Sequence, residues 1–306
     1  MTITVFGSIN IDLTTYSERL PKSGETLHGQ RYAIGLGGKG CNQAVAITAL
    51  GAKVTLVGRI GNDEFGSNAQ KLLTKFGVDS ASVFVDQSNA TGIAVISVDA
   101  QAENSITVIG GANMAVDQSD VTRQKTVFEQ TKVLLLQMEI PLLATLSAAD
   151  IVRSNNGVVV LDPAPAPLGG LDPAILKRID IITPNEIETE ALCGIKPKDA
   201  NQAAQAATLL REQGVNIAII KLGAKGVYYQ SETEDGFVSA FKVDSIDTVA
   251  AGDCFNGGLA YQLTQGTSLG KAVEFAAACG ALSTTKAGAA ESAPGLSDVL
   301  ELSSPV

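Results

Sequence analysis

The chain has 306 residues, a formal net charge of −10 and a hydrophobic content of 45%. This length and apolar content suffice for one large domain with an appended element. An acidic surface repels nucleic acid and anionic lipid, so neither is an expected partner. The start, MTITVFGSIN, enters a strand pattern without a basic leader, and the longest apolar stretches are too short for a membrane span. We therefore expect a cytoplasmic protein.

Cysteine and histidine usage narrows the chemistry further. The four cysteines are scattered without CxxC spacing, so we expect reduced thiols rather than a disulfide framework or a zinc site. The single histidine, His28, argues against a histidine triad or a multi-histidine metal centre. If the substrate is anionic, helix N-termini, lysines or a metal must balance its charge locally, because the protein is acidic overall.

Strand and helix patterns alternate along the chain. Continuous Val/Ile/Leu runs, typical of parallel strands covered on both faces, lie at 2–7, 53–58, 132–137, 157–162, 180–183 and 216–223. Helical patterns end at Gly51, Gly77 and Gly214, and two Ala/Gly-rich helices are predicted at about 252–264 and 268–285. This alternation predicts an α/β fold with a doubly wound, mostly parallel central sheet flanked by helices.

Two segments interrupt the alternation. Residues 12–35 and 90–109 lack helical periodicity. The runs TGIAVISVD and NSITVI within the second segment indicate strands. We interpret the two segments as a small β-sheet lid inserted into the main fold. No linker separates an independent unit, so residues 1–306 are expected to form a single α/β domain.

The glycine-rich stretch AIGLGGKGCNQA, residues 33–44, is the first candidate binding loop. It fails the P-loop pattern, because Gly40 follows Lys39 where a hydroxyl residue is required and Ala33 occupies the position of the first glycine. It matches G-x-G-x-x-G, but it follows the irregular segment rather than the first strand, which weakens a dinucleotide-binding interpretation. The loop is then either a simple turn into a helix or a cradle for a hydroxyl-rich ligand.

Nearby polar residues favour the cradle. GSINID puts Asn10 and Asp12 at the predicted end of the first strand, and ligands bind at the carboxyl ends of parallel strands. Together with Lys39 and Asn42, they supply the donors and acceptors that several sugar hydroxyls require.

The second glycine site is DTVAAGDCFNGGLA, residues 247–260. Small residues at 250–252 precede Asp253 at a predicted helix N-terminus, where backbone N–H groups attract anions. Asp253 is either an N-cap or a base that accepts a proton from an attacking hydroxyl while the amides hold a transferring phosphoryl group.

These two stretches resemble the two signature regions of the ribokinase-like (pfkB-type) carbohydrate kinases. GSINID, PKSGET, QMEIP, DPAPA, ITPNEIE and KLGAKG also follow the order and spacing of that family, so the resemblance covers nearly the whole chain. It implies transfer of the γ-phosphoryl group of ATP to a sugar hydroxyl, and the motifs are most similar to those of members that phosphorylate D-ribose at O5. It also implies a homodimer formed through the lid sheets.

The resemblance assigns roles to individual residues. Asp253 matches the catalytic base, and the anion hole would consist of the amides of Ala250, Ala251, Gly252 and Asp253. Sugar contacts are implied for Asn10, Asp12, Gly38, Lys39, Gly40, Asn42, Glu139 and Asp253, with apolar lid contacts from Ala94, Ile96 and Val108.

Nucleotide and cation positions follow in the same way. Nucleotide contacts are implied for Asn185, Lys221, Gly223, Ala224, Lys225, Gly226, Gly252 and Ala277. Glu188, with Asn185, would organise Mg²⁺ through water; without the resemblance, the pair would be a surface acidic turn that opens a helix. A monovalent cation, K⁺, would sit among Asp247, Val249, Ser283, Lys286, Gly288 and Ser292.

One departure and three rival functions remain. Many family members have glycine where this chain has Ala250, and alanine would be strained there if the backbone φ is positive. The rivals are a related kinase for deoxyribose, a ketose, a nucleoside or a sugar acid, a non-catalytic sugar-binding protein, and a nicotinamide-dependent oxidoreductase.

Overall fold

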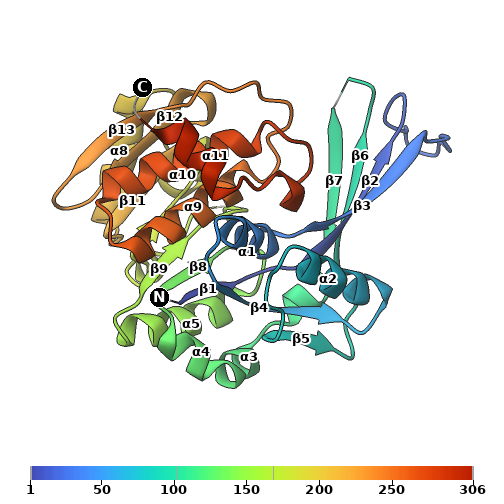
Figure 1. The fold of residues 1–306 in the computed structure, drawn as a ribbon, viewed down its shortest axis with the longest axis horizontal. Coiled ribbons are helices and arrows are strands. Elements are labelled where there is room, and N and C mark those ends of the chain that lie inside the picture. The colour runs from blue at the N-terminus through green and yellow to red at the C-terminus, as the bar shows by residue number, and fades with distance from the viewer. Residues whose placement is uncertain (1, 102, 168, 305–306) are drawn as a thin grey trace.

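A nine-stranded sheet forms the centre of the molecule (Figure 1). The computed structural model describes residues 2–101, 103–167 and 169–304, so residue 102 of the expected lid segment lies outside the described residues. The strand order is β13-β12-β11-β10-β9-β8-β1-β4-β5, and all pairs are parallel except the two that involve β12. The strands are β1 (Ile3–Phe6), β4 (Val54–Gly61), β5 (Val83–Asp86), β8 (Val133–Leu136), β9 (Val158–Leu161), β10 (Ile181–Ile182), β11 (Ile217–Lys221), β12 (Gly226–Gln230) and β13 (Asp235–Ser239).

Helices cover both faces of this sheet (Figure 1). One face packs against α1 (Lys39–Ala49), α2 (Glu64–Lys75), α9 (Ala251–Gln265) and α10 (Leu269–Ser283), and α11 (Leu296–Ser303) lies on α10. The other face packs against α3 (Gln118–Arg123), α4 (Lys125–Gln130), α5 (Leu142–Ser154), α6 (Pro173–Leu176), α7 (Glu186–Cys193) and α8 (Ala200–Glu212). The layers follow from side-chain alternation, because Ile3 and Val5 of β1 join the first core and Phe6 joins the second.

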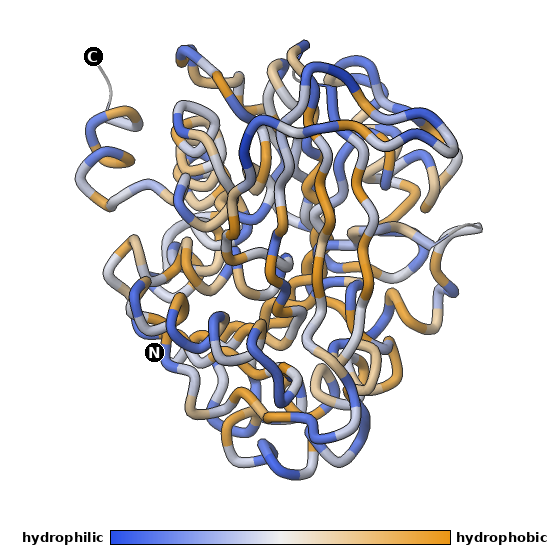
Figure 2. Tube along the Cα trace, turned by 90° about the vertical axis from the view of Figure 1, so that its right-hand side faces the viewer, coloured by the Kyte–Doolittle hydropathy of each residue, from blue (hydrophilic) through white to orange (hydrophobic). Residues whose placement is uncertain are grey.

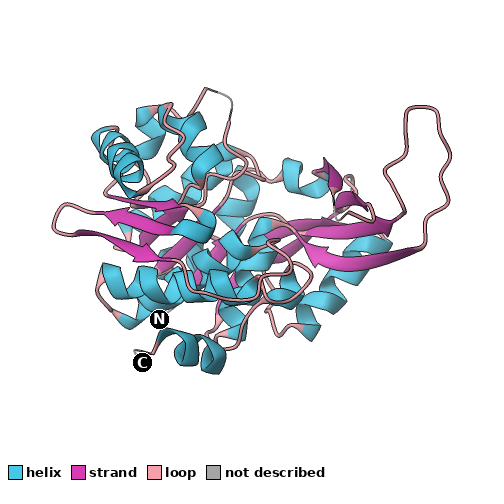
Figure 3. Cartoon of the chain, turned by 90° about the horizontal axis from the view of Figure 1, so that it is seen from above, coloured by secondary structure: helices cyan, strands magenta, loops and turns pink. Residues whose placement is uncertain are grey.

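A second, four-stranded sheet extends from one side of the large sheet (Figures 1 and 3). Its order is β3-β2-β6-β7, and only β2 and β6 are parallel. The strands are β2 (Asn10–Tyr16), β3 (Arg31–Gly37), β6 (Gly92–Val98) and β7 (Asn104–Ile109). A second, small sheet is thereby confirmed, as is the doubly wound, mostly parallel main sheet; β2 begins before residue 12 and β3 ends after residue 35, so the expected bounds of the first segment were too narrow.

The fold brings several polar segments together at one edge. The carboxyl ends of β1, β8, β9 and β10 are followed by residues 7–10, 137–139, 162 and 183–185. Ligands of open α/β sheets bind at such an edge. Among the residues that the structure describes, no helix combines the length and the apolar character needed to cross a membrane.

Candidate active site

The first glycine loop joins the small sheet to α1. Gly38 has a φ of 88°, and α1 begins at the next residue, Lys39. Glycine adopts this positive φ at little cost. Gly40 packs directly on the end of β1, since a Cβ at Gly40 would lie only 2.7 Å from the Cα of Gly7. The glycines therefore press the loop onto the carboxyl edge of the large sheet.

The predicted sugar-contact residues come from several elements. The expectation that Asn10 and Asp12 end the first strand is wrong, because β1 stops at Phe6 and both residues lie on β2 of the small sheet. Glu139, which follows β8, accepts a hydrogen bond from the backbone N–H of Lys39 at 3.0 Å. This bond ties the segment after β8 to the glycine loop.

Asp12 shares one face of the small sheet with the predicted apolar residues. Asp12 is paired with Ala94, and Ala94 is paired with Val108. Ile96 lies two residues beyond Ala94 and therefore on the same face. Burial raises the pKa of the Asp12 carboxyl to about 6, and the nearby carboxylates of Glu139 and Glu291 contribute less to the rise.

The second glycine site forms the N-terminus of α9. Ala250 is the N-cap residue, with a φ of 60°, so Asp253 lies inside the first turn and the N-cap interpretation of Asp253 is wrong. The Asp253 side chain is 4% exposed. Nδ2 of Asn42 donates to its Oδ2 at 3.1 Å, and Nε2 of Gln43 donates to its Oδ1 at 3.1 Å. The two glycine sites, two hundred residues apart in the sequence, thus meet at this carboxylate.

Opposed charges control protonation around Asp253. Burial raises the pKa of its carboxyl to about 6, while the nearby Lys39 ammonium opposes the rise. Burial alone would lower the pKa of Lys39, but the surrounding carboxylates of Asp253, Asp162 and Glu139 raise it, so the ammonium stays charged. The Lys39 ammonium therefore stays charged beside a carboxylate whose pKa is raised to about 6.

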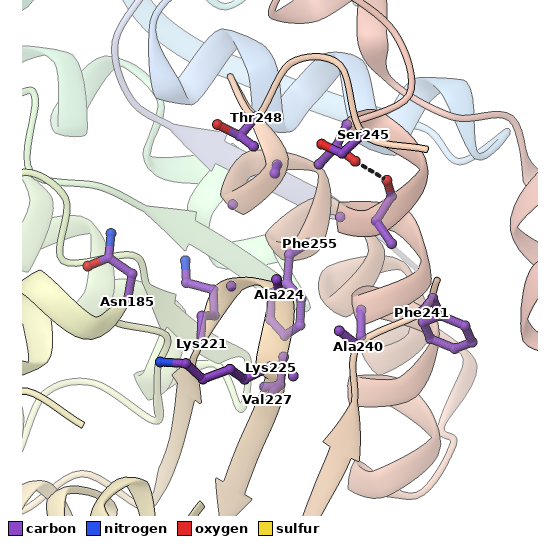
Figure 4. Close-up of a pocket in the computed structure, with 18 of the residues that line it drawn as sticks. Asn185, Lys221, Ala224, Lys225, Val227, Ala240, Phe241, Ser245, Thr248 and Phe255 are labelled. Carbon is purple, nitrogen blue, oxygen red and sulfur yellow. Dashed lines mark hydrogen bonds between the residues drawn. The ribbon is translucent and has the colours of Figure 1, made fainter. Parts of the chain in front are cut away.

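A cavity of about 950 Å³ opens next to Asp253 (Figure 4). Asn185, Lys221 and Lys225 lie on one side of it, and Ala240 and Phe241 lie on the other. Its lining includes all eight predicted nucleotide residues, Asn185, Lys221, Gly223, Ala224, Lys225, Gly226, Gly252 and Ala277, together with Lys39, Glu188, Ala250, Ala251 and Asp253. A cavity with a polar side and an apolar side suits a nucleotide, whose phosphates and base differ in the same way.

Asn185 and Glu188 form a capping box at the start of α7. The Asn185 side chain accepts from the N–H groups of Ile187 and Glu188, and the Glu188 carboxylate accepts from the backbone and side chain of Asn185. The helix-opening interpretation of this motif is therefore confirmed. Both residues also line the cavity, and burial raises the pKa of the Glu188 carboxyl.

The predicted cation positions lie on two neighbouring segments. Asp247 accepts from the backbone N–H of Val249 through Oδ1 and from that of Gly288 through Oδ2, each at 3.0 Å. Ser283 and Ser292 are fully buried, while Lys286 follows Ser283 in the turn after α10. Among the described residues, no group of three or more His, Cys, Asp or Glu side chains is arranged to hold a metal ion.

Sequence reasoning missed Gln43 and Asp162. Gln43 is fully buried and contacts both Asp253 and Asp162, whereas Asp162 also accepts from Nζ of Lys221 at 3.2 Å. The sequence contained one signal for each residue. Gln43 directly follows Asn42 in the glycine loop, and Asp162 directly follows a buried strand at the ligand-binding edge.

The φ of Ala250 yields a stability prediction. A left-handed conformation costs a non-glycine residue roughly 1–2 kcal/mol, partly offset because glycine gains about 0.4–1 kcal/mol of unfolded-state entropy. We expect Ala250→Gly to raise the free energy of unfolding by up to about 1 kcal/mol. The control Ala251→Gly, at the first right-handed position of α9, should lower it by about 0.5–1 kcal/mol. Denaturant unfolding measures both, and an equal loss in the two variants would contradict this account.

Known proteins resemble this chain over almost its whole length. The model of the pfkB family carbohydrate kinases matches residues 2–296. A ribokinase of Haemophilus influenzae is 41% identical over 300 residues, covering 98% of this chain and 97% of the relative. A deoxyribokinase of Salmonella typhi is 34% identical over 296 residues, covering 97% and 96%. The structure of Arabidopsis thaliana ribokinase complexed with ribose and ATP has a TM-score of 0.88 at 31% identity and covers 99% of each chain.

The fold and the site define a carbohydrate kinase, an enzyme that transfers phosphate to an alcohol. More narrowly, the chain belongs to the pfkB family of carbohydrate kinases.

Proposed function

We propose that this protein transfers the γ-phosphoryl group of ATP to O5 of D-ribose and releases ribose 5-phosphate and ADP. One observation carries the proposal. A buried carboxylate, Asp253, lies where the nucleotide-sized cavity meets the predicted sugar loop. The names of the relatives that are 41% and 34% identical point to ribose and deoxyribose as substrates.

The reaction assigns one task to the Asp253 side chain and another to the backbone amides at the N-terminus of α9. The Asp253 carboxylate accepts the proton of the sugar hydroxyl, whose oxygen attacks the γ-phosphorus while the bond to the leaving ADP oxygen breaks. The backbone amides of residues 250–253 form the anion hole, because the first N–H groups of α9 have no partner within the helix. The N–H of Ala251 donates to the carbonyl of Thr248 at 3.3 Å and exchanges this bond for the phosphate. Alignment of the two substrates and charge stabilisation supply most of the rate.

Asn10, Asp12, Lys39, Asn42 and Glu139 bind the sugar hydroxyls in this proposal. Gly38 and Gly40 let the loop backbone approach the sugar, and Ala94, Ile96 and Val108 cover it from the small sheet, which acts as a lid within a single domain. Carboxylates and amides outnumber cations in this set, so a neutral polyol fits better than a phosphorylated sugar.

Lys221, Lys225 and the turn 223–226 bind the phosphates of ATP, and the apolar side of the cavity near Ala277 takes the base. The residues fit Mg²⁺ held through water, since Glu188 is a cavity-lining carboxylate whose oxygens are already oriented by Asn185. The metal would neutralise phosphate charge when bound.

A monovalent cation, K⁺, is proposed beside the anion hole. Asp247, Val249, Ser283, Lys286, Gly288 and Ser292 would surround it, several through backbone carbonyls. The hydrogen bond from the backbone N–H of Gly288 to Oδ2 of Asp247 holds the two segments together, which brings these residues close enough to fit one ion.

A substrate panel tests the proposed function. ADP release is measured with ATP and ribose, deoxyribose, a ketose, a nucleoside or a sugar acid. We expect the highest kcat/KM with ribose. Preference for deoxyribose, the second candidate because of the Salmonella relative, would change the substrate and keep the class. The absence of ADP release with every acceptor would contradict the proposal.

The raised pKa of Asp253 predicts how the rate falls at low pH, on the acid limb of the pH–rate profile. Only the ionised Asp253 carboxylate accepts a proton, and its pKa is raised to about 6. We therefore expect kcat/KM for ribose to fall as the pH drops through about 6, with a slope steeper than one because Asp12 titrates in the same range. A profile that stays level to well below that pH would contradict the role of Asp253.

We also propose a homodimer formed through the small sheets. Ile106 and Val108 of β7 are 53% and 56% exposed on the face that carries Asp12. Figure 2, turned so that the side of the molecule with the small sheet faces the viewer, shows hydrophobic residues along the strands there. Exposed apolar sheet faces favour association. We expect Ile106→Lys to produce monomers in analytical ultracentrifugation, whereas Leu209→Lys on α8 should not. A monomeric unsubstituted protein would contradict the dimer.

A further inference from the structure

A buried chain of hydrogen bonds links Asp253 to Lys221 beneath the site. Nε2 of Gln43 donates to Oδ1 of Asp253 at 3.1 Å and to Oδ2 of Asp162 at 3.3 Å. The other oxygen of Asp162 accepts from Nζ of Lys221 at 3.2 Å. Gln43 is fully buried and Asp162 is 3% exposed. A single carboxamide therefore bridges the carboxylate at the helix N-terminus and the ion pair in the cavity wall.

The orientation of this carboxamide is fixed from both ends. Its Oε1 accepts from Nε2 of Gln137 at 2.7 Å, so only its NH₂ group is directed at the carboxylates. A flipped amide would place an oxygen against two anionic groups and leave buried acceptors unpaired, which costs about 1–3 kcal/mol for each group. The two carboxylates therefore favour the orientation in which the NH₂ group of Gln43 faces them.

Two different side chains hold the two carboxylate oxygens of Asp253. Oδ1 is held by Gln43, which is buried, whereas Oδ2 is held by Asn42, which belongs to the predicted sugar loop. The carboxylate cannot turn Oδ2 away from the sugar loop without breaking the bond to Gln43. An ionised carboxylate oxygen has room for a second donor, so Oδ2 can accept the sugar proton while Asn42 remains bound.

We propose that Gln43 and Asp162 are positioning residues for phosphoryl transfer. They fix the position of Asp253, next to the sugar loop, relative to that of Lys221, in the wall of the nucleotide cavity. This inference rests on the proposed function. The charged groups facing Asp253 are Lys39 of α1 and Asp162 after β9. The neighbouring thiols of Cys41 and Cys254 stay neutral because burial raises their pKa values.

Two variants with a matched control test the inference. Gln43→Met removes the bridge at similar volume, and we expect kcat to fall by about 10- to 100-fold with little change in the KM for ribose. Asp162→Asn should lower kcat and move the acid limb to lower pH, because Asp253 loses a nearby like charge. The control Asp180→Asn removes the negative charge that pairs with Arg153 before the start of β10, at the end of that strand away from the site, and it should cost stability without moving the acid limb.

Each result supports or overturns the inference. Wild-type kcat in folded Gln43→Met and folded Asp162→Asn would overturn it. It would also be overturned if Asp162→Asn lost only as much free energy of unfolding as Asp180→Asn and left the acid limb of the pH–rate profile unmoved. A crystal structure of Gln43→Met gives a readout that does not require turnover, with a rotated Asp253 carboxylate expected and an unmoved one overturning the inference. An inactive wild-type protein would instead refute the proposed function, and a Gln43→Met variant that fails to fold leaves Asp162→Asn decisive.

Discussion

Asp253→Asn is expected to lower kcat by at least about 100-fold while the dissociation constant for ribose stays within a few-fold of the wild-type value. The amide matches the carboxylate in size and still has an oxygen for the bonds from Asn42 or Gln43, but it cannot take up the hydroxyl proton. Steady-state kinetics give kcat, and titration calorimetry gives the ribose affinity in the absence of ATP.

The control for this variant is again Asp180→Asn, which replaces a partly buried aspartate far from the cavity. It should keep wild-type kcat. Asp253→Asn should not unfold more easily than wild type, because burial already disfavours the charged carboxylate. If Asp253→Asn keeps half of its activity, Asp253 is not the base.

Lys39→Ala is expected to raise the KM for ribose by about tenfold or more, with a smaller fall in kcat. A hydrogen bond to a charged group contributes about 1.5–3 kcal/mol, and the Lys39 ammonium lies among the carboxylates of Asp253, Asp162 and Glu139, of which Asp162 also pairs with Lys221. Its loss leaves these carboxylates facing one another. The KM values for ribose and for ATP, measured separately, distinguish a sugar-binding role from a nucleotide-binding role.

Lys225→Ala provides the matched comparison for Lys39→Ala. Lys225 is 52% exposed, pairs with Glu186 at 3.1 Å and lines the nucleotide cavity. Its loss should raise the KM for ATP and leave that for ribose unchanged. The reverse pattern, with Lys39→Ala affecting only ATP, would mean that the sugar and nucleotide sites are assigned the wrong way round.

The six buried strands could be predicted because each is a continuous apolar run whose signal is local. Three further strands of the large sheet were missed because their apolar runs are short or interrupted by polar residues. β5 is a four-residue edge strand with Phe84 37% exposed, and β12 and β13 form a hairpin whose outer strand is largely exposed. Such strands are defined by the partner they pair with rather than by their own hydrophobicity.

The candidate site was predictable where function imposes a local pattern, as in the loop at 38–42 and the turn at 250–253. The bridge made by Gln43 was not, because its partners Asp162 and Asp253 lie more than a hundred residues away in the sequence. Asn10 and Asp12 were placed on the wrong strand, since residues 7–9 give no sign that the chain leaves one sheet and enters another.

A crystal structure with ribose and a non-hydrolysable ATP analogue tests the central claim most directly. The account predicts that O5 of ribose lies at about 3 Å from a carboxylate oxygen of Asp253 and in line with the terminal phosphate, which is held by the amides of residues 250–253. Ribose bound with O5 against Asp12 or Glu139, or a terminal phosphate distant from the start of α9, would contradict it.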